Sequence, residues 1–121
     1  MFMAEHDLIA GMRAYRVSWR ADVPSIETGV VCLRGRQRKV HTRDGQWHRA
    51  ALFCKTIAGA ITWEVELISY RGSHGHTYRS AENIYDPETV IDRICRLSRL
   101  IAKLKRHRLL GVRDLRVAFS P

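Results

Sequence analysis

A long amphipathic helix near the C-terminus constrains the fold more than any other part of this sequence. Asp86 is a favourable N-cap, and Pro87 suits the first helical position, where its missing N–H costs nothing. Gly111 is a natural stop. The pattern predicts a helix from Asp86 to about Leu110, roughly 36 Å long at 1.5 Å per residue. Apolar residues recur along it at helical spacing: Val90, Ile94, Leu97, Ile101 and Leu104.

A second stripe on the same helix is basic and is turned away from the apolar one. Its members recur every three or four residues: Arg93, Arg96, Arg99, Lys103 and Arg106. One interpretation is a solvated face whose cations suit the negative end of the helix. The other is a row of cations that faces phosphates or an acidic partner. Between residues 93 and 116 there are nine Lys/Arg and one acid. A helix charged only for solubility mixes signs, so this imbalance favours the second interpretation.

Length and composition favour a single globular domain over residues 1–121. Hydrophobic residues make up 45% of the 121 residues and charged residues 27%, which is enough for a core and argues against disorder. No apolar run reaches the length of a membrane span, and residues 1–12 lack the basic region of a secretory signal. The three cysteines form no CxxC pair and lie in apolar contexts. We therefore expect buried free thiols, a cytoplasmic protein and no membrane association.

Alternating segments upstream of the helix predict a sheet. The clearest alternation is in residues 60–70, where apolar and polar side chains take opposite sides. Residues 22–25 are expected to form a turn, and residues 4–12 either a short helix or an unstructured lead. The expected fold class is α+β, an antiparallel β-meander of four to five strands with one long amphipathic C-terminal helix packed on one face. Strands are predicted at 13–20, 28–33, 47–57 and 60–70, with short ones at 76–80 and 115–119.

A second basic block contributes to the net charge of +9. Residues 34–49 hold six Lys/Arg and one acid, and guanidinium groups offer planar donor forks that suit phosphates. The Arg-Gly-Arg core at 34–36 is similar to the AT-hook, a minor-groove motif, with Gln37 where that motif has proline. A solvated hairpin arm is the alternative interpretation. The candidate phosphate ligands in this block are Arg34, Arg36, Arg38, Lys39 and Arg43.

Aromatic residues beside cations are candidates for stacking nucleic-acid bases. Trp47 precedes His48 and Arg49, and Tyr78 precedes Arg79. These two aromatics are the expected exposed pair. An exposed aromatic ring next to arginine can stack an unpaired base while the arginine contacts its phosphate. Trp19 alternates with polar neighbours and is expected in the core, as is Trp63.

Metal binding and catalysis find little support in the sequence. Histidines 41, 48, 74 and 76 together with Cys54 show none of the spacings of a zinc site, so no metal or cofactor is expected. Glu64 and Glu66 on one strand face would suit a divalent metal in a nuclease, but a solvated sheet face is the preferred interpretation. Neither GxSxG, nor a P-loop, nor HExxH occurs, and the sequence does not favour an enzyme.

Two hypotheses of function follow. The first is a non-enzymatic nucleic-acid-binding accessory protein that grips the phosphate backbone of DNA or RNA with the basic helix stripe and the Arg-rich hairpin arm. The alternative is a small protein-binding modulator, an inhibitor or adaptor that acts on a nucleic-acid-handling or acidic partner, for which a phage or mobile-element origin would fit the size. The choice between single and double strands stays open. A homodimer is an option if Ile91, Cys95 and Leu109 stay exposed.

Overall fold

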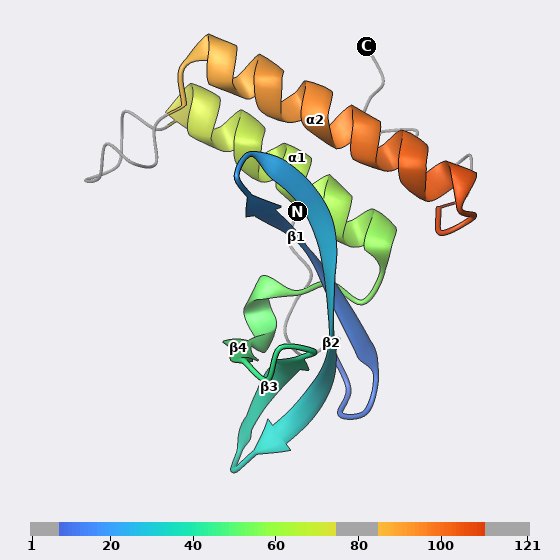
Figure 1. The fold of residues 1–121 in the computed structure, drawn as a ribbon. Coiled ribbons are helices and arrows are strands. Elements are labelled where there is room, and N and C mark those ends of the chain that lie inside the picture. Colours follow the sequence, from blue (N-terminus) through green and yellow to red (C-terminus); the bar gives the residue numbers. More distant parts are fainter. Residues whose placement is uncertain (1–7, 75–84, 111–121) are drawn as a thin grey trace.

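A long β-hairpin joins two halves of the molecule in the computed structural model, which describes residues 8–74 and 85–110 (Figure 1). The four strands form one antiparallel sheet in the order β1-β2-β3-β4. This confirms the expected α+β fold with an antiparallel meander and a long C-terminal helix. The elements are β1 (Arg13–Arg20), β2 (Val23–Arg34), β3 (Gln37–Thr42), β4 (Trp47–Arg49), a 3₁₀ turn (Ala50–Leu52), α1 (Ile57–His74) and α2 (Pro87–Arg106).

Two tight turns set the pairing of the first three strands. Ala21 and Asp22 connect β1 to β2 with φ of 48° and 63°, and Gly35 opens the β2–β3 turn with φ of 65°. Positive φ at these positions matches the twist of a hairpin. The expected turn at residues 22–25 was too long, because residues 23–25 already belong to β2. Pro24 is tolerated there since β3 pairs with β2 only from Gly29 onward.

The upper core lies between the two helices and the end of the hairpin nearest to them (Figure 1). Leu97, Ile101 and Leu104 of α2 are buried, so the predicted apolar stripe is confirmed. They pack with Ile61 and Ile68 of α1 in one cluster. The Asp86 side chain accepts a hydrogen bond from the Thr89 backbone N–H at 2.7 Å and caps the helix as expected.

A second, smaller core lies at the other end of the hairpin. We call the part of the sheet farther from the helices the lower sheet; it consists of β3, β4 and the adjoining ends of β1 and β2. The second core covers only one face of the lower sheet, toward which every second residue of each strand points. The 3₁₀ turn and the segment after it close this core from outside, and the opposite face of the lower sheet is left uncovered by this cluster. Its buried members are Leu8, Ala14, Val31, Val40, Ala50 and Phe53.

Residues 60–70, predicted as a strand, lie inside α1. Ile61, Val65 and Ile68 share one face of this helix and contribute to the upper core. An apolar residue at every second position also fills many positions of a helical stripe, so a short window fits both periods. The contacts with α2 and β1 favour the helix, because the residues that they bury lie on one helical face and not at every second position.

Smaller differences concern the remaining segments. The strand expected at 47–57 stops at Arg49, and β2 extends the strand expected at 28–33. Residues 8–12, the described part of a possible N-terminal helix, are not helical.

Cys54 is buried, but Cys32 is half-buried and Cys95 is exposed, so the expectation of three buried thiols was wrong. The helix predicted to run to about Leu110 and stop at Gly111 ends earlier, at Arg106, with His107 as its C-cap. The strands expected at 76–80 and 115–119 and the residue Tyr78 lie outside the described residues. No helix in the described ranges is long and apolar enough to cross a membrane.

Candidate nucleic-acid interface

The strand register brings a set of basic side chains onto the uncovered face of the lower sheet. Directly paired residues share a face of an antiparallel sheet. One row therefore runs from Arg13 through Val30 and His41 to Trp47. The next row runs from Cys32 through Lys39 to Arg49, and Arg34 lies beyond it on β2. The basic sheet face, as we define it, consists of Arg13, Val30, Cys32, Arg34, Lys39, His41, Trp47 and Arg49.

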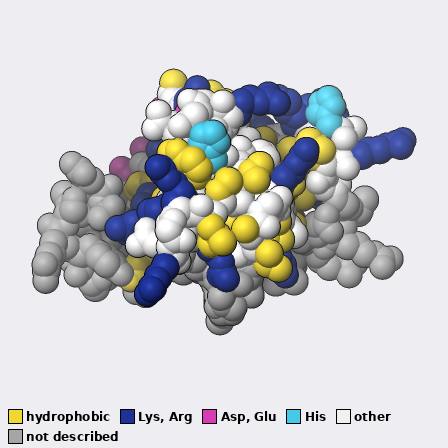
Figure 2. Space-filling view, turned by 90° about the horizontal axis from the view of Figure 1, so that it is seen from below, with side chains coloured by type: hydrophobic (Ala, Val, Ile, Leu, Met, Phe, Trp, Pro, Cys, Tyr) yellow, Lys and Arg dark blue, Asp and Glu magenta, His cyan; other side chains and the backbone are white. Residues whose placement is uncertain are grey.

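The basic sheet face carries positive charge, and no acidic residue belongs to it. Four of its eight residues are Lys or Arg, His41 is a fifth basic group, and none of the eight is an acid. At the lower end of the molecule, which adjoins this face, Lys, Arg and His side chains surround a group of hydrophobic side chains (Figure 2). A face that carries an aromatic ring among cations can contact a flat apolar group and anionic groups at once.

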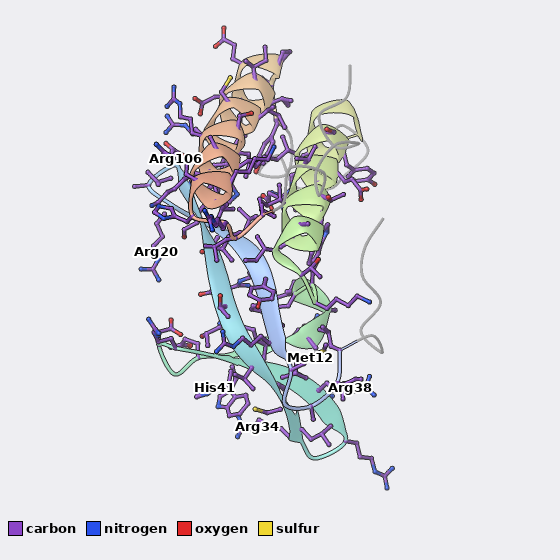
Figure 3. All side chains as sticks on the ribbon, turned by 90° about the vertical axis from the view of Figure 1, so that its right-hand side faces the viewer. Met12, Arg20, Arg34, Arg38, His41 and Arg106 are labelled. Atoms are coloured by element: carbon purple, nitrogen blue, oxygen red, sulfur yellow. The ribbon has the colours of Figure 1, made fainter. Side chains whose placement is uncertain are left out.

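Trp47 is the aromatic residue of the basic sheet face. Its side chain is 41% exposed, as predicted from the sequence. The Arg34 guanidinium carbon lies 4.4 Å from the centroid of the indole ring, within range of a cation–π contact. The His41 ring centroid is also 4.4 Å away. Arg34 and His41 project from the side of the sheet opposite to Met12 and Arg38 (Figure 3).

The basic passage at residues 34–43 is divided among different surfaces. Arg34 and Lys39 belong to the basic sheet face, and Arg36 is exposed in the β2–β3 turn. Arg38 is half-buried on the other face, opposite Leu33 in the register. Arg43 lines a hollow that also contains the acidic residues Glu27 and Asp44 and that borders the basic sheet face at Arg13, Val30 and His41. The structure therefore does not bring the five predicted residues together into one arm.

The helix stripe is divided as well, and the expectation that all five cations are exposed was wrong. Arg93 is half-buried over the Trp19 ring, with its guanidinium carbon 4.2 Å from the ring centroid. Arg96 donates to the carboxylate of Asp92 at 2.8 Å and to the backbone carbonyl of Asp22 at 3.1 Å. These two arginines fasten α2 to the β1–β2 turn. Both are partly shielded from solvent because the tip of the hairpin folds back against the helix.

Three stripe residues, Arg99, Lys103 and Arg106, are exposed. Arg99 and Lys103 line a groove of about 680 Å³ between the hairpin and α2. None of the residues that line it is an acid. The groove has an apolar part that includes Tyr15 and Leu100. Its basic residues are Arg13, Arg96, Arg99, Lys103 and His107. Because Arg13 belongs to both surfaces, the basic groove and the basic sheet face adjoin each other.

Glu64 was expected on the solvated face of a strand, but it lies on α1 and links two elements of the structure. The Trp19 indole N–H donates to Glu64 Oε1 at 2.8 Å, which links α1 to β1. Burial raises the pKa of the Glu64 carboxyl, although the Trp19 hydrogen bond and the charges of Arg71 and Arg93 act in the other direction. Glu64 and Glu66 are two apart on a helix and do not face each other, so the paired-carboxylate geometry is absent. Trp19 packs against the upper core, as predicted.

Sequence reasoning missed several basic residues of these surfaces: Arg13, Arg49 and His107 as contributors to a site, and His41 as the neighbour of Trp47. Arg13 falls on the same side of the strand as Tyr15 by alternation, but it was not predicted as a site residue. That alternation was a usable signal, but only the packing shows where this side of β1 is uncovered. No group of three or more His, Cys, Asp and Glu residues in the described ranges is placed to hold a metal ion.

Comparison of the chain with models of protein families, with curated proteins and with solved structures found no match.

Proposed function

We propose that this protein is a non-enzymatic nucleic-acid-binding accessory protein that holds backbone phosphates on the basic sheet face and in the adjoining groove. The observation that carries the proposal is the register, which places Arg13, Arg34, Lys39 and Arg49 on the same uncovered face as Trp47. Lys and Arg that neutralise phosphates release condensed counterions, which supplies most of the affinity of such surfaces.

A titration with labelled oligonucleotides tests this proposal. Single- and double-stranded DNA and RNA are titrated at two salt concentrations, and affinity is expected to fall as salt rises. The reversal Lys39→Glu with Arg49→Glu is expected to weaken binding strongly. Reversal of Lys55 and Arg20 to Glu makes the same charge change on exposed residues outside both surfaces, and serves as the matched control. Absence of retention of every nucleic acid at low salt would refute the proposal.

A protein-binding modulator is the second candidate, and exposed apolar side chains favour it. Ile9 is 66% exposed and Leu33 is 61% exposed, and both lie on or beside the lower half of the hairpin. Apolar residues next to cations also fit the surface of an acidic protein. This candidate predicts tight binding to one protein partner, abolished by the Lys39 and Arg49 reversal, together with weak binding of nucleic acids of any length.

A further inference from the structure

We infer that the ligand of the basic sheet face is single-stranded nucleic acid, with an unpaired base stacked at Trp47. This inference rests on the proposed function and specifies the strandedness of the ligand. It draws on the arrangement of the residues within the face, and not on its net charge, because any nucleic acid satisfies the charge.

The basic sheet face carries apolar side chains on β2 and on the edge strand β4, with His41 of β3 between them in the row. Val30 is exposed, and Trp47 lies in the same row, with Cys32 next to Val30 on β2. A duplex presents phosphates and sugars on its outside and keeps the faces of its bases stacked inside. Docked on this sheet, a duplex would contact the cations and leave Val30 and the Trp47 ring without an apolar partner. An unpaired base has an apolar face of its own, which can stack on the Trp47 ring while the adjoining phosphates meet the cations.

Trp47 is held ready for such a base by its neighbours. The contacts with Arg34 and His41, each 4.4 Å from the indole centroid, restrict the ring before a ligand arrives. Arg34 is exposed, and its long side chain is free to move off the ring as a base takes its place. A base can also stack directly on the planar guanidinium, since arginine planes serve as stacking surfaces in RNA recognition. Both arrangements put the base next to Trp47 and its phosphates close to Lys39 and Arg49.

The width of the face matches a short single strand. The row from Arg13 to Trp47 crosses four strands, which is roughly 14 Å at about 4.8 Å between neighbouring strands. A stacked strand advances about 3.4 Å per nucleotide, so roughly four nucleotides cover this row. Beyond Arg13, the groove lined by Arg99 and Lys103 offers phosphate partners to the continuing chain.

Oligonucleotides that lack bases provide a direct test. The probes are a single strand of about twelve nucleotides in DNA and in RNA form, the same strands with abasic residues in the central positions, and the corresponding duplexes. Binding is measured by fluorescence anisotropy. Intact single strands are expected to bind roughly five- to hundredfold more tightly than abasic ones, the range for removal of one stacked base. Base dependence in either the DNA or the RNA arm supports the inference, and the comparison of arms identifies the sugar.

Variants at Trp47 attribute the effect to this site. Trp47→Ala is expected to remove most of the difference between intact and abasic strands, and Trp47→Phe to retain it. The salt dependence is expected to be unchanged in both, because every cation that meets a phosphate is still present. A thermal melt checks the fold of each variant, and the exposed position of Trp47 makes both substitutions compatible with folding.

Four results separate failure of this inference from failure of the proposed function. Equal affinity for intact and abasic strands, or tighter binding of duplexes than of single strands, overturns the inference and leaves nucleic-acid binding intact. Undiminished binding of intact strands by the folded Trp47→Ala variant also overturns it. Failure of every probe to bind at low salt rejects the proposed function, and this inference with it.

Discussion

The turn that joins β1 to β2 consists of two residues in left-handed conformations without a glycine. Ala21 has φ of 48° and Asp22 has φ of 63°. A left-handed conformation costs a residue with a Cβ roughly 1–2 kcal/mol. The contacts from α2 offset part of this cost, since Arg96 donates to the Asp22 carbonyl and the Arg93 guanidinium lies 3.8 Å from the Asp22 carboxylate.

We expect Ala21→Gly to stabilise the protein. Glycine relieves the strain of positive φ, but it loses about 0.4–1 kcal/mol through the greater freedom of the unfolded chain. The net gain in the free energy of unfolding is expected to be about 0.5–1 kcal/mol, measured by urea denaturation. Ala102→Gly, at an exposed position within α2, is the matched control and is expected to lose about 0.5–1 kcal/mol. A loss at position 21 as large as that at 102 would contradict the explanation by strain.

Glu64 makes a pH-dependent contribution to stability. Burial raises the pKa of its carboxyl, so the folded protein keeps this proton to a higher pH than the unfolded chain does. Retention of this proton stabilises the folded protein, and this stabilisation is complete at pH below the ordinary pKa of glutamate. It is lost as the pH rises through the raised pKa that Glu64 has in the folded protein. Above the raised pKa the Glu64 carboxylate is charged, and in the folded protein it has less contact with water than it has in the unfolded chain.

We expect Glu64→Gln to gain stability relative to wild type as pH rises from about 4 to about 7. Glutamine keeps an acceptor for the Trp19 indole N–H and carries no charge to desolvate. Unfolding in denaturant at both pH values measures the difference between variant and wild type. Glu88→Gln, in the exposed first turn of α2, has no burial to relieve and is expected to show no such gain. A Glu64→Gln difference that is equal at both pH values, or larger at the lower one, would show that burial does not penalise this charge.

At the level of elements, α2 has one face packed in the upper core and another that carries the exposed cations Arg99, Lys103 and Arg106. Leu97 and Ile101 lie in the upper core, and their truncation to alanine is expected to cost about 2–5 kcal/mol each in the free energy of unfolding. Ile91→Ala removes the same kind of side chain at a position that is 63% exposed, and is expected to change stability by less than about 0.5 kcal/mol. Thermal and urea melts distinguish these outcomes. Equal losses at 91 and 97 would mean that the apolar stripe is not what anchors α2.

At the level of the whole molecule, the groove beside α2 and the basic sheet face adjoin at Arg13 and are proposed to hold one continuous ligand. Removal of one cation that neutralises a phosphate of a single strand lowers the slope of log K against log salt by about 0.7. Reversal of Arg99 and Lys103 to Glu is therefore expected to flatten the slope by roughly 1.4, and reversal of Lys39 and Arg49 by a similar amount.

The two double reversals are expected to add when combined, because one strand long enough to cross both surfaces depends on cations in each. An oligonucleotide of about four nucleotides, which covers only one row of the sheet, is the matched probe and should respond to the Lys39 and Arg49 reversal alone. If the reversal in the groove leaves the slope for long strands unchanged, the two surfaces do not act on one ligand.

The sequence alone predicts much of α2 and of the hairpins, because their signals are local. The N-cap at Asp86, the helical spacing from Val90 to Leu104 and the alternation of residues 13–20 each express a preference within a few residues of the chain. The exposure of Trp47 follows in the same way from its place among polar residues. The role of these residues in binding stays a prediction.

Contacts between distant segments decided the rest. Residues 60–70 satisfy the strand period and the helical period together, and only the packing of α1 against α2 and β1 selects the helix. The destination of Arg93 and Arg96 depends on the hairpin tip, which lies 74 positions before Arg96 in the chain and folds against α2. The basic sheet face depends on register, because a shift of one residue would turn Lys39 and Arg49 toward the second core. Charge in a sequence shows how many cations a chain carries, and the tertiary structure decides which of them hold the fold together and which face solvent.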